Sequence, residues 1–134
     1  MISFDHNWLA LIVAAVVNMA IGAGWYGYFA EPWMEGNGFT REQIEADGDN
    51  TPYIFAVANS LVMPFVLANV MKWAGVSGLV NGLLMGLLMW AGFTALTFAS
   101  NHAFEGRSFK MWGIIAGMYM VGLMAIGAIL GAWQ

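Results

Sequence analysis

A run of 23 residues near the C-terminus contains no charged side chain: residues 111–133, MWGIIAGMYMVGLMAIGAILGAW. A helix needs about 20 consecutive apolar residues to cross the hydrocarbon core of a bilayer. An open sheet would leave backbone groups unpaired in lipid, and the run lacks the polar–apolar alternation of a barrel strand. The sequence therefore predicts a transmembrane helix over Met111–Trp133.

Three further stretches share this character. Toward the N-terminus they are Leu79–Ala99, Tyr53–Ala74 and Trp8–Ala30, and Lys72 is their one charged residue. The first run is longer than the apolar core of a signal peptide and has no Lys or Arg before it. We therefore expect an all-α fold in which residues 1–134 form one domain, a four-helix transmembrane bundle.

The composition supports a membrane protein and excludes several other classes. Hydrophobic residues make up 60% of the chain and charged residues 9%, whereas soluble domains carry about 25% charged residues. The net charge of -4 provides no basic surface, so we expect no nucleic-acid partner. The absence of Cys excludes disulfides and thiolate chemistry. The expected first partner is the lipid bilayer.

The links between the predicted helices differ in length. Gly75–Gly78 predicts a tight hairpin, and Ser100–Lys110 joins the third and fourth helices. The first link, Glu31–Pro52, is long, and its Thr40–Gln43 is a capping-box pattern that predicts a short interfacial helix. Residues that favour helix N-caps precede the four spans: Asn7, Thr51, Ser77 and Ser108.

Positive charges are distributed unevenly over the links. Arg41, Arg107 and Lys110 lie in the first and third links, whereas Lys72 lies on the side of both termini. Cytoplasmic loops of membrane proteins carry an excess of Lys and Arg. This distribution predicts that both termini lie outside the cytoplasm.

Small residues repeat at helical spacing on the last two predicted helices. On the fourth helix a stripe follows steps of four and three: Gly113, Gly117, Met120, Met124, Gly127 and Gly131. The third helix begins with a similar stripe: Gly78, Gly82 and Gly86. Small residues allow close approach of helices in lipid, which provides no hydrophobic force for association. The stripes predict tight helix packing, either within the chain or between copies.

Asparagines lie on a comparable stripe of the second helix. Asn59 is followed there by Val62, Val66 and Asn69. An amide in lipid is costly, so we expect each of these asparagines to face protein. Asn69 is placed where it could bond to Asn81 across the hairpin.

Four other polar side chains lie near the middle of the predicted membrane: Asn18, Trp90, Thr94 and Tyr119. The indole N–H and the phenolic O–H each need a partner there. We therefore expect a polar cluster inside the bundle. Two roles remain open for it, a structural one and the floor of a ligand-binding pocket.

Ionisable residues are absent from the deep parts of the predicted spans, and this disfavours a proton-coupled transporter. His102, Glu105 and Arg107 form an interfacial polar cluster, in which we expect Glu105 to pair with Arg107. A metal site usually needs three or four protein ligands. We assign no catalytic residue, metal ligand or cofactor, and an enzymatic role is disfavoured but stays open.

Four strings resemble a known family when they are taken together: Asn7–Ala10 (NWLA), Gly24–Gly27 (GWYG), Phe104–Arg107 (FEGR) and Gly127–Trp133 (GAILGAW). Their order and spacing resemble a family of small bacterial four-helix membrane proteins catalogued as a domain of unknown function. The resemblance spans essentially the whole chain. It implies a bacterial inner-membrane protein and carries no activity or site residue to transfer.

Two functions from different classes remain. The glycine stripes and the lack of buried charge favour a non-enzymatic scaffold, either a homo-oligomer or an accessory subunit of a larger membrane complex. The alternative is a channel or carrier for a small neutral or lipid-like solute. It would use the mid-membrane polar cluster and the bend expected at Pro64.

Overall fold

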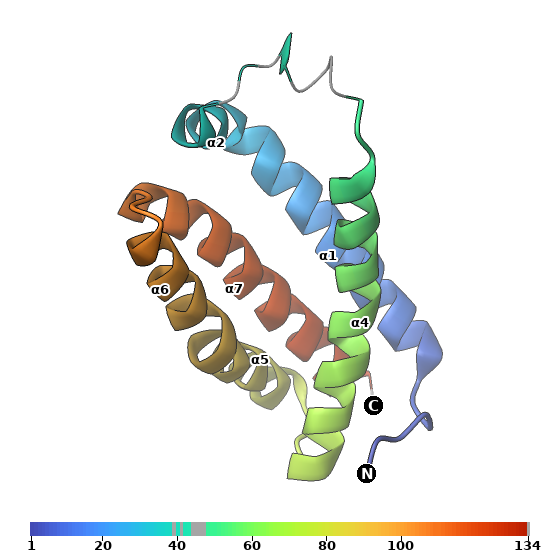
Figure 1. Ribbon diagram of the computed structural model, residues 1–134. Helices are drawn as coiled ribbons and strands as arrows, with labels where there is room; N and C mark the ends of the chain where they lie inside the picture. Colours follow the sequence, from blue (N-terminus) through green and yellow to red (C-terminus); the bar gives the residue numbers. More distant parts are fainter. Residues whose placement is uncertain (39, 41, 44–47, 134) are drawn as a thin grey trace.

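The computed structural model describes residues 1–134 except 39, 41, 44–47 and 134. Four long helices that alternate in direction dominate it (Figure 1). They are α1 (Trp8–Tyr28), α4 (Thr51–Ala74), α7 (Phe109–Ala132) and a third long helix made of α5 (Leu79–Met89), the π-helical turn η1 (Trp90–Ala95) and α6 (Leu96–Phe104).

Each of these four helices is long and apolar enough to cross a membrane. Large apolar side chains such as Leu61, Phe93 and Leu96 are exposed on the outside. Monomeric soluble proteins rarely expose large apolar patches, whereas lipid covers such surface without cost. The all-α fold with four membrane-spanning helices, predicted from the sequence, is confirmed.

Helix α7 lies at the centre of the arrangement. It packs against α5 most extensively, then against α1, and more sparsely against α4, η1 and α6 (Figure 1). Helix α4 packs against α1 but makes few contacts with α5. The buried core gathers α1, α4 and α7 residues: Ala10, Leu11, Ala14, Leu67, Ala68, Met71, Leu123, Ile126 and Leu130. Helix α4 and the third long helix therefore both pack against α7 but make few contacts with each other.

The predicted hairpin joins α4 to α5 at the same end of the molecule as both chain termini (Figure 1). Gly75 ends α4 in the left-handed conformation, with φ of 68°. Glycine adopts this conformation without the steric cost of a Cβ atom. The Val76 N–H then donates to the Met71 carbonyl at 2.9 Å, so the helix end keeps a backbone partner.

Two of the four predicted caps form. The side chains of Asn7 and Ser108 accept the N–H groups of Ala10 and Met111, at 3.2 and 3.3 Å. The cap predicted at Thr51 is wrong, because α4 already begins at that residue. The cap predicted at Ser77 is wrong as well, because Gly78 occupies that position before α5.

The first link contains a short helix, α2 (Ala30–Asn37), and a short helix was predicted in this link. It begins directly after α1 rather than at Thr40. The predicted capping box also forms, since the Thr40 N–H donates to Gln43 Oε1 at 2.9 Å and the Gln43 N–H to Thr40 Oγ1 at 3.2 Å. Most of the helix predicted to follow lies outside the described residues.

The third long helix continues to Phe104, past its predicted end at Ala99. The polar residues after Ala99 read as a loop in the sequence, yet His102 is buried and donates from Nδ1 to the Phe98 carbonyl at 2.8 Å. The link to α7 is therefore only residues 105–108, where Gly106 has φ of 70°.

The N-terminal segment is bound to the end of α4. The Asn69 amide is buried and pairs with the Ser3 backbone, accepting from its N–H at 2.7 Å and donating to its carbonyl at 3.2 Å. The expected bond between Asn69 and Asn81 does not form, because Asn81 donates to the Ser77 carbonyl in the link before α5. Trp73 adds a bond to the Met1 carbonyl.

Candidate functional site

A cleft of about 430 Å³ opens between α4 and the third long helix, at the middle of the four spans. We call it the α4–α6 cleft. Helix α4 forms one wall, α5, η1 and α6 form the other, and α7 lies behind them. Its lining residues are Asn59, Val62, Met63, Val66, Leu67, Val70, Met89, Phe93, Thr94, Phe98, Tyr119 and Leu123.

Local irregularities shape both walls of the cleft. Pro64 is buried in α4 and has no N–H for the carbonyl of Ser60, one turn earlier. On the other wall η1 widens one helical turn, and the consecutive residues Phe93 and Thr94 both line the cleft. Single π-helical turns in α-helices are frequent at functional sites. The cleft thus lies between two interruptions of regular helix.

Three polar side chains line this otherwise apolar cleft. They are Asn59 from α4, Thr94 from η1 and Tyr119 from α7. Among the described residues, no hydrogen bond to any of these side chains is formed. The Tyr119 ring packs near the Phe98 ring, with centroids 5.5 Å apart. Three groups that can donate and accept hydrogen bonds therefore converge on one cleft.

The structure separates the four residues expected to cluster at mid-membrane. Thr94 and Tyr119 share the cleft, but Asn18 and Trp90 do not line it. Asn18 donates to Ser60 Oγ at 2.9 Å and lies against Gly122, between α1, α4 and α7. Trp90 donates from its indole to the Ala116 carbonyl at 2.8 Å. The side chains of Asn18 and Trp90 therefore have hydrogen-bond partners within the chain.

Two other indoles follow the pattern of Trp90. Trp25 donates to the Ile114 carbonyl and Trp112 to the Ala95 carbonyl, each at 2.8 Å. Ala95 is the last residue of η1, so the bond from Trp112 joins α7 to the end of the π-helical turn. Backbone carbonyls thus satisfy three indole groups inside the bundle.

The predicted glycines occupy three environments. In the α5–α7 seam, a Cβ on Gly82 would collide with the Gly127 carbonyl, one on Gly86 with that of Leu123, and one on Gly131 with that of Gly78. Gly117 instead faces the Trp25 ring, where a Cβ would lie 3.1 Å from Cζ2. Gly113 has no neighbour within 4 Å.

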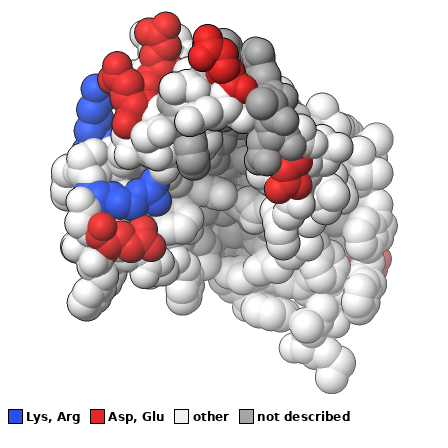
Figure 2. Space-filling model, turned by 45° about the horizontal axis from the view of Figure 1, so that its top comes forward, with Lys and Arg blue, Asp and Glu red and all other residues white. Residues whose placement is uncertain are grey.

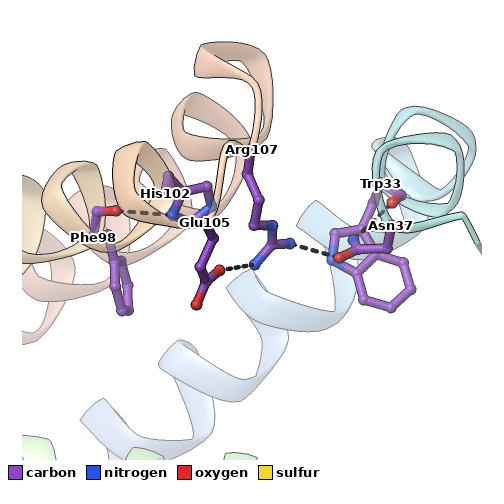
Figure 3. Close-up of polar contacts among 6 residues, drawn as sticks. All are labelled: Trp33, Asn37, Phe98, His102, Glu105 and Arg107. Carbon is purple, nitrogen blue, oxygen red and sulfur yellow. Dashed lines mark hydrogen bonds and ion pairs between the residues drawn. The ribbon is translucent and has the colours of Figure 1, made fainter.

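The polar cluster of His102, Glu105 and Arg107 lies at the end of the molecule opposite the chain termini. Arg107 stands between Glu105, 3.7 Å away, and the Asn37 side-chain oxygen of α2, to which it donates (Figure 3). His102 Nδ1 bonds to Phe98, and its buried Nε2 has no partner among the described residues. Arg107 thus connects the α6–α7 link to α2.

Charged side chains gather at this same end, around a hollow in the surface (Figure 2). Among the described residues, no three His, Asp or Glu side chains are close enough to hold a metal ion together. Glu105 is exposed and Arg107 is partly exposed, so their ion pair contributes little to stability. The cluster is therefore best described as a link between surface elements.

Sequence reasoning missed several residues that line the cleft. Only Asn59 was expected to face protein on α4 here, and Val62 and Val66, which are 55% and 51% exposed, were not assigned to a site. Phe93 and Phe98, on the opposite wall, carry no polar atom that would have singled them out. The available signal was the step of four residues from Asn59 to Met63 and from Val62 to Val66, which places them along one side of α4.

Residues 9–131 match a family described as "Protein of unknown function (DUF1761)". No curated protein and no solved structure matches the chain. The match covers nearly the whole chain, and it confirms the resemblance carried by the four sequence strings. The chain therefore belongs to the DUF1761 family, and its four apolar helices indicate a membrane protein.

Proposed function

We propose that this protein binds a small neutral or lipid-like molecule in the α4–α6 cleft and acts as its carrier. The observation that carries the proposal is the set of three unpaired polar side chains, Asn59, Thr94 and Tyr119, around one cleft. A polar group without a hydrogen bond in an apolar environment costs about 1–3 kcal/mol. A bound molecule with polar atoms would remove this cost.

The lining also restricts the molecule. No Asp, Glu, Lys, Arg or His is among the lining residues, so a charged group would have no counter-ion there. The volume of about 430 Å³ falls in the range of about 300–1,000 Å³ that small-molecule sites occupy. Both features favour a neutral molecule, or the head of a lipid, over a charged solute.

Native mass spectrometry of the protein in nanodiscs tests this binding. Val66→Trp would fill the cleft, whereas Val57→Trp, on an exposed part of α4 outside the lining, is the matched control. We expect a reproducible extra mass on the native chain and on the control, and its loss from Val66→Trp. Absence of any extra mass, or its retention in Val66→Trp, would count against the proposal.

Carrier activity needs a second measurement. Purified protein in liposomes should increase the flux of at least one neutral solute in a broad panel above that of empty liposomes. The same flux should fall to the empty-liposome level for Val66→Trp and persist for Val57→Trp. Equal flux in all samples would reduce the proposal to binding alone.

A non-enzymatic scaffold, as a homo-oligomer or an accessory subunit of a membrane complex, is the second candidate. It is favoured by exposed glycines of the long helices where an added Cβ would meet nothing within 4 Å: Gly24, Gly27, Gly92 and Gly113. A helix of a second chain could approach closely at these positions. Gly113→Leu should then convert an oligomer to a monomer in native mass spectrometry, and a monomeric native chain argues against a homo-oligomer.

We also propose a bacterial inner membrane as the location, with both termini outside the cytoplasm. The chain has no Cys, so single cysteines give a clean readout. Ile2→Cys and Glu105→Cys place a thiol at opposite ends, both at exposed positions. A membrane-impermeant maleimide should label Ile2→Cys on intact spheroplasts and Glu105→Cys only after lysis. The reverse result would invert the orientation.

A further inference from the structure

The polar side chains of the α4–α6 cleft differ from several other polar side chains of the bundle, which have hydrogen-bond partners within the chain. Asn18 has Ser60 as its partner, and Trp25, Trp90 and Trp112 each have a backbone carbonyl. Asn59, Thr94 and Tyr119 come from three different elements and have no such partner among the described residues. A molecule in the cleft could provide hydrogen-bond partners for all three.

The chemistry of these groups selects the atoms of that partner. A phenol, a hydroxyl and an amide NH₂ all donate hydrogen bonds, and acceptor oxygens complement them. Carboxylate and phosphate oxygens would bring a negative charge to mid-membrane with no cation in the lining. Carbonyl oxygens accept without carrying charge. A neutral group that presents carbonyl oxygens therefore fits the donors of this cleft.

Aromatic rings border the same part of the cleft. Phe93 and Phe98 line one wall, and the Phe98 and Tyr119 rings lie at 55° to each other. Aromatic rings gain from offset-stacked and edge-to-face contacts with another ring. A planar ring that bears the carbonyl groups would accept hydrogen bonds from the hydroxyls at its edge and contact the two phenylalanines with the side that faces their wall.

An apolar track leads away from the polar groups along α4. Val62, Val66 and Val70 follow one another at steps of four, so they lie on one side of the helix. Met63 and Met89 stand beside this track, and methionine side chains adapt to irregular partners. Val66 is 51% exposed, so a chain on this track would reach the surrounding lipid. The track suits a hydrocarbon tail.

We infer that the α4–α6 cleft binds a quinone-type lipid: a neutral planar ring bearing carbonyl groups, with a hydrocarbon tail. This inference rests on the proposed function and names the chemical class of its ligand. Tyr119, Thr94 and Asn59 donate to the ring carbonyls, Phe93 and Phe98 contact the ring, and the tail follows the α4 valines.

Competition between probes of equal tail length tests the inference. Delipidated protein in phosphatidylcholine nanodiscs receives decylubiquinone, decanol and decanoic acid together, and native mass spectrometry resolves the adducts by mass. We expect the decylubiquinone adduct to dominate. Tyr119→Phe and Thr94→Val should each weaken it about three- to tenfold, since each removes one hydrogen bond. Tyr28→Phe, at the exposed end of α1 and outside the cleft, is the matched control and should leave it unchanged.

Two outcomes overturn the inference. One is a dominant decanol or decanoate adduct, and the other is undiminished decylubiquinone binding by both Tyr119→Phe and Thr94→Val at unchanged thermal stability. In either case the proposed function survives if a natural ligand mass is still lost from Val66→Trp and kept by Val57→Trp. If neither the probes nor a natural ligand bind, the inference and the proposed function both fail.

Discussion

The α5–α7 seam and the α4–α6 cleft show opposite ways of placing two membrane helices beside α7. At the seam Gly82 and Gly127 bring two backbones into contact, so that a Cβ on either would collide with the carbonyl of the other. At the cleft the facing residues are mainly Val, Met and Phe, and the space between the two walls has a volume of about 430 Å³. Residue size at the contact therefore sets how closely each helix approaches its neighbours.

Because of this difference, one part of the bundle, the seam, provides stability, whereas another part, the cleft, is free for the proposed binding. Helices associate in lipid mainly through close packing and hydrogen bonds between helices. The seam supplies close packing along α5, and indole–carbonyl bonds continue the contact at Trp90 and Trp112. The cleft wall on α4 is held from its other side, by α1, so the cleft itself need not close.

Gly127→Leu should produce the largest effect. The new side chain would meet the Gly82 backbone, which cannot move aside as a flexible side chain does. We expect a loss of about 4 kcal/mol or more, the range of severe core disruption, and hence failure to give a monodisperse protein in size-exclusion chromatography. Gly113→Leu, with no neighbour within 4 Å, is the control and should remain monodisperse. Similar behaviour of both variants would refute the importance of the seam.

Asn18→Leu should destabilise the bundle by about 1–2 kcal/mol, the range of a buried hydrogen bond between membrane helices. It leaves the buried Ser60 hydroxyl without its donor and places a branched side chain against Gly122. Thermal unfolding in detergent measures the change. Ser60→Ala should destabilise the bundle less than Asn18→Leu. It leaves the Asn18 amide without its acceptor, but this amide is less buried than the Ser60 hydroxyl. An unchanged melting temperature for Asn18→Leu would contradict this role.

Hydropathy revealed the helices but not the partners of each helix face. Runs of apolar residues define the four spans because lipid requires length and low charge. The stripes containing Gly127 and Gly82 could both be recognised from their spacing, but the sequence did not show that these two glycines face each other. Spacing fixes which residues share a face, but rotation of each helix about its axis depends on contacts over the whole bundle.

The candidate site shows the same limit. The depth of Asn18, Trp90, Thr94 and Tyr119 followed from sequence position, but the direction of each side chain did not. The π-helical turn η1 adds a residue to one turn, which shifts the following residues by about 100° relative to a regular helix. No local pattern in Trp90–Ala95 announces this shift, so Phe98 could not be placed on the cleft wall from sequence.

Asn59→Leu tests whether the amide in the cleft contributes to the stability of the fold. Asn59 has no partner among the described residues, so its replacement by Leu breaks no hydrogen bond and removes an unpaired polar group. Because Asn59 is only partly buried, we expect the unfolding free energy to rise by about 1 kcal/mol, the low end of the cost of such a group. Thermal unfolding of the ligand-free protein provides the measurement, with Asn18→Leu beside it. Equal destabilisation by the two variants would mean that the cleft amide supports the fold, and the distinction between a satisfied bundle and an unsatisfied cleft would fail.

The smallest expected effect is a pH dependence at the start of α4, the cleft wall. Asp49 accepts the backbone N–H of Thr51 at 3.0 Å, and hydrogen bonds from the Thr51 backbone and side chain hold the pKa of this exposed carboxyl below its ordinary value. A lowered pKa in the folded state means that the stabilisation is complete above the ordinary value of about 4. It is lost as the pH falls through the lowered pKa.

Hydrogen exchange at Tyr53 and Ile54, whose N–H groups bond to the Asn50 carbonyl, reports on this first turn. Protection there, corrected for the intrinsic pH dependence of exchange, should fall slightly below about pH 4 in the native chain. Asp49→Asn removes the carboxylate, so its protection should be lower at neutral pH and should not change further in acid. Identical acid profiles for the two proteins would assign the change to another group. Because the seam at Gly82 and Gly127 has no titratable side chain, protection in α5 should not follow the same curve.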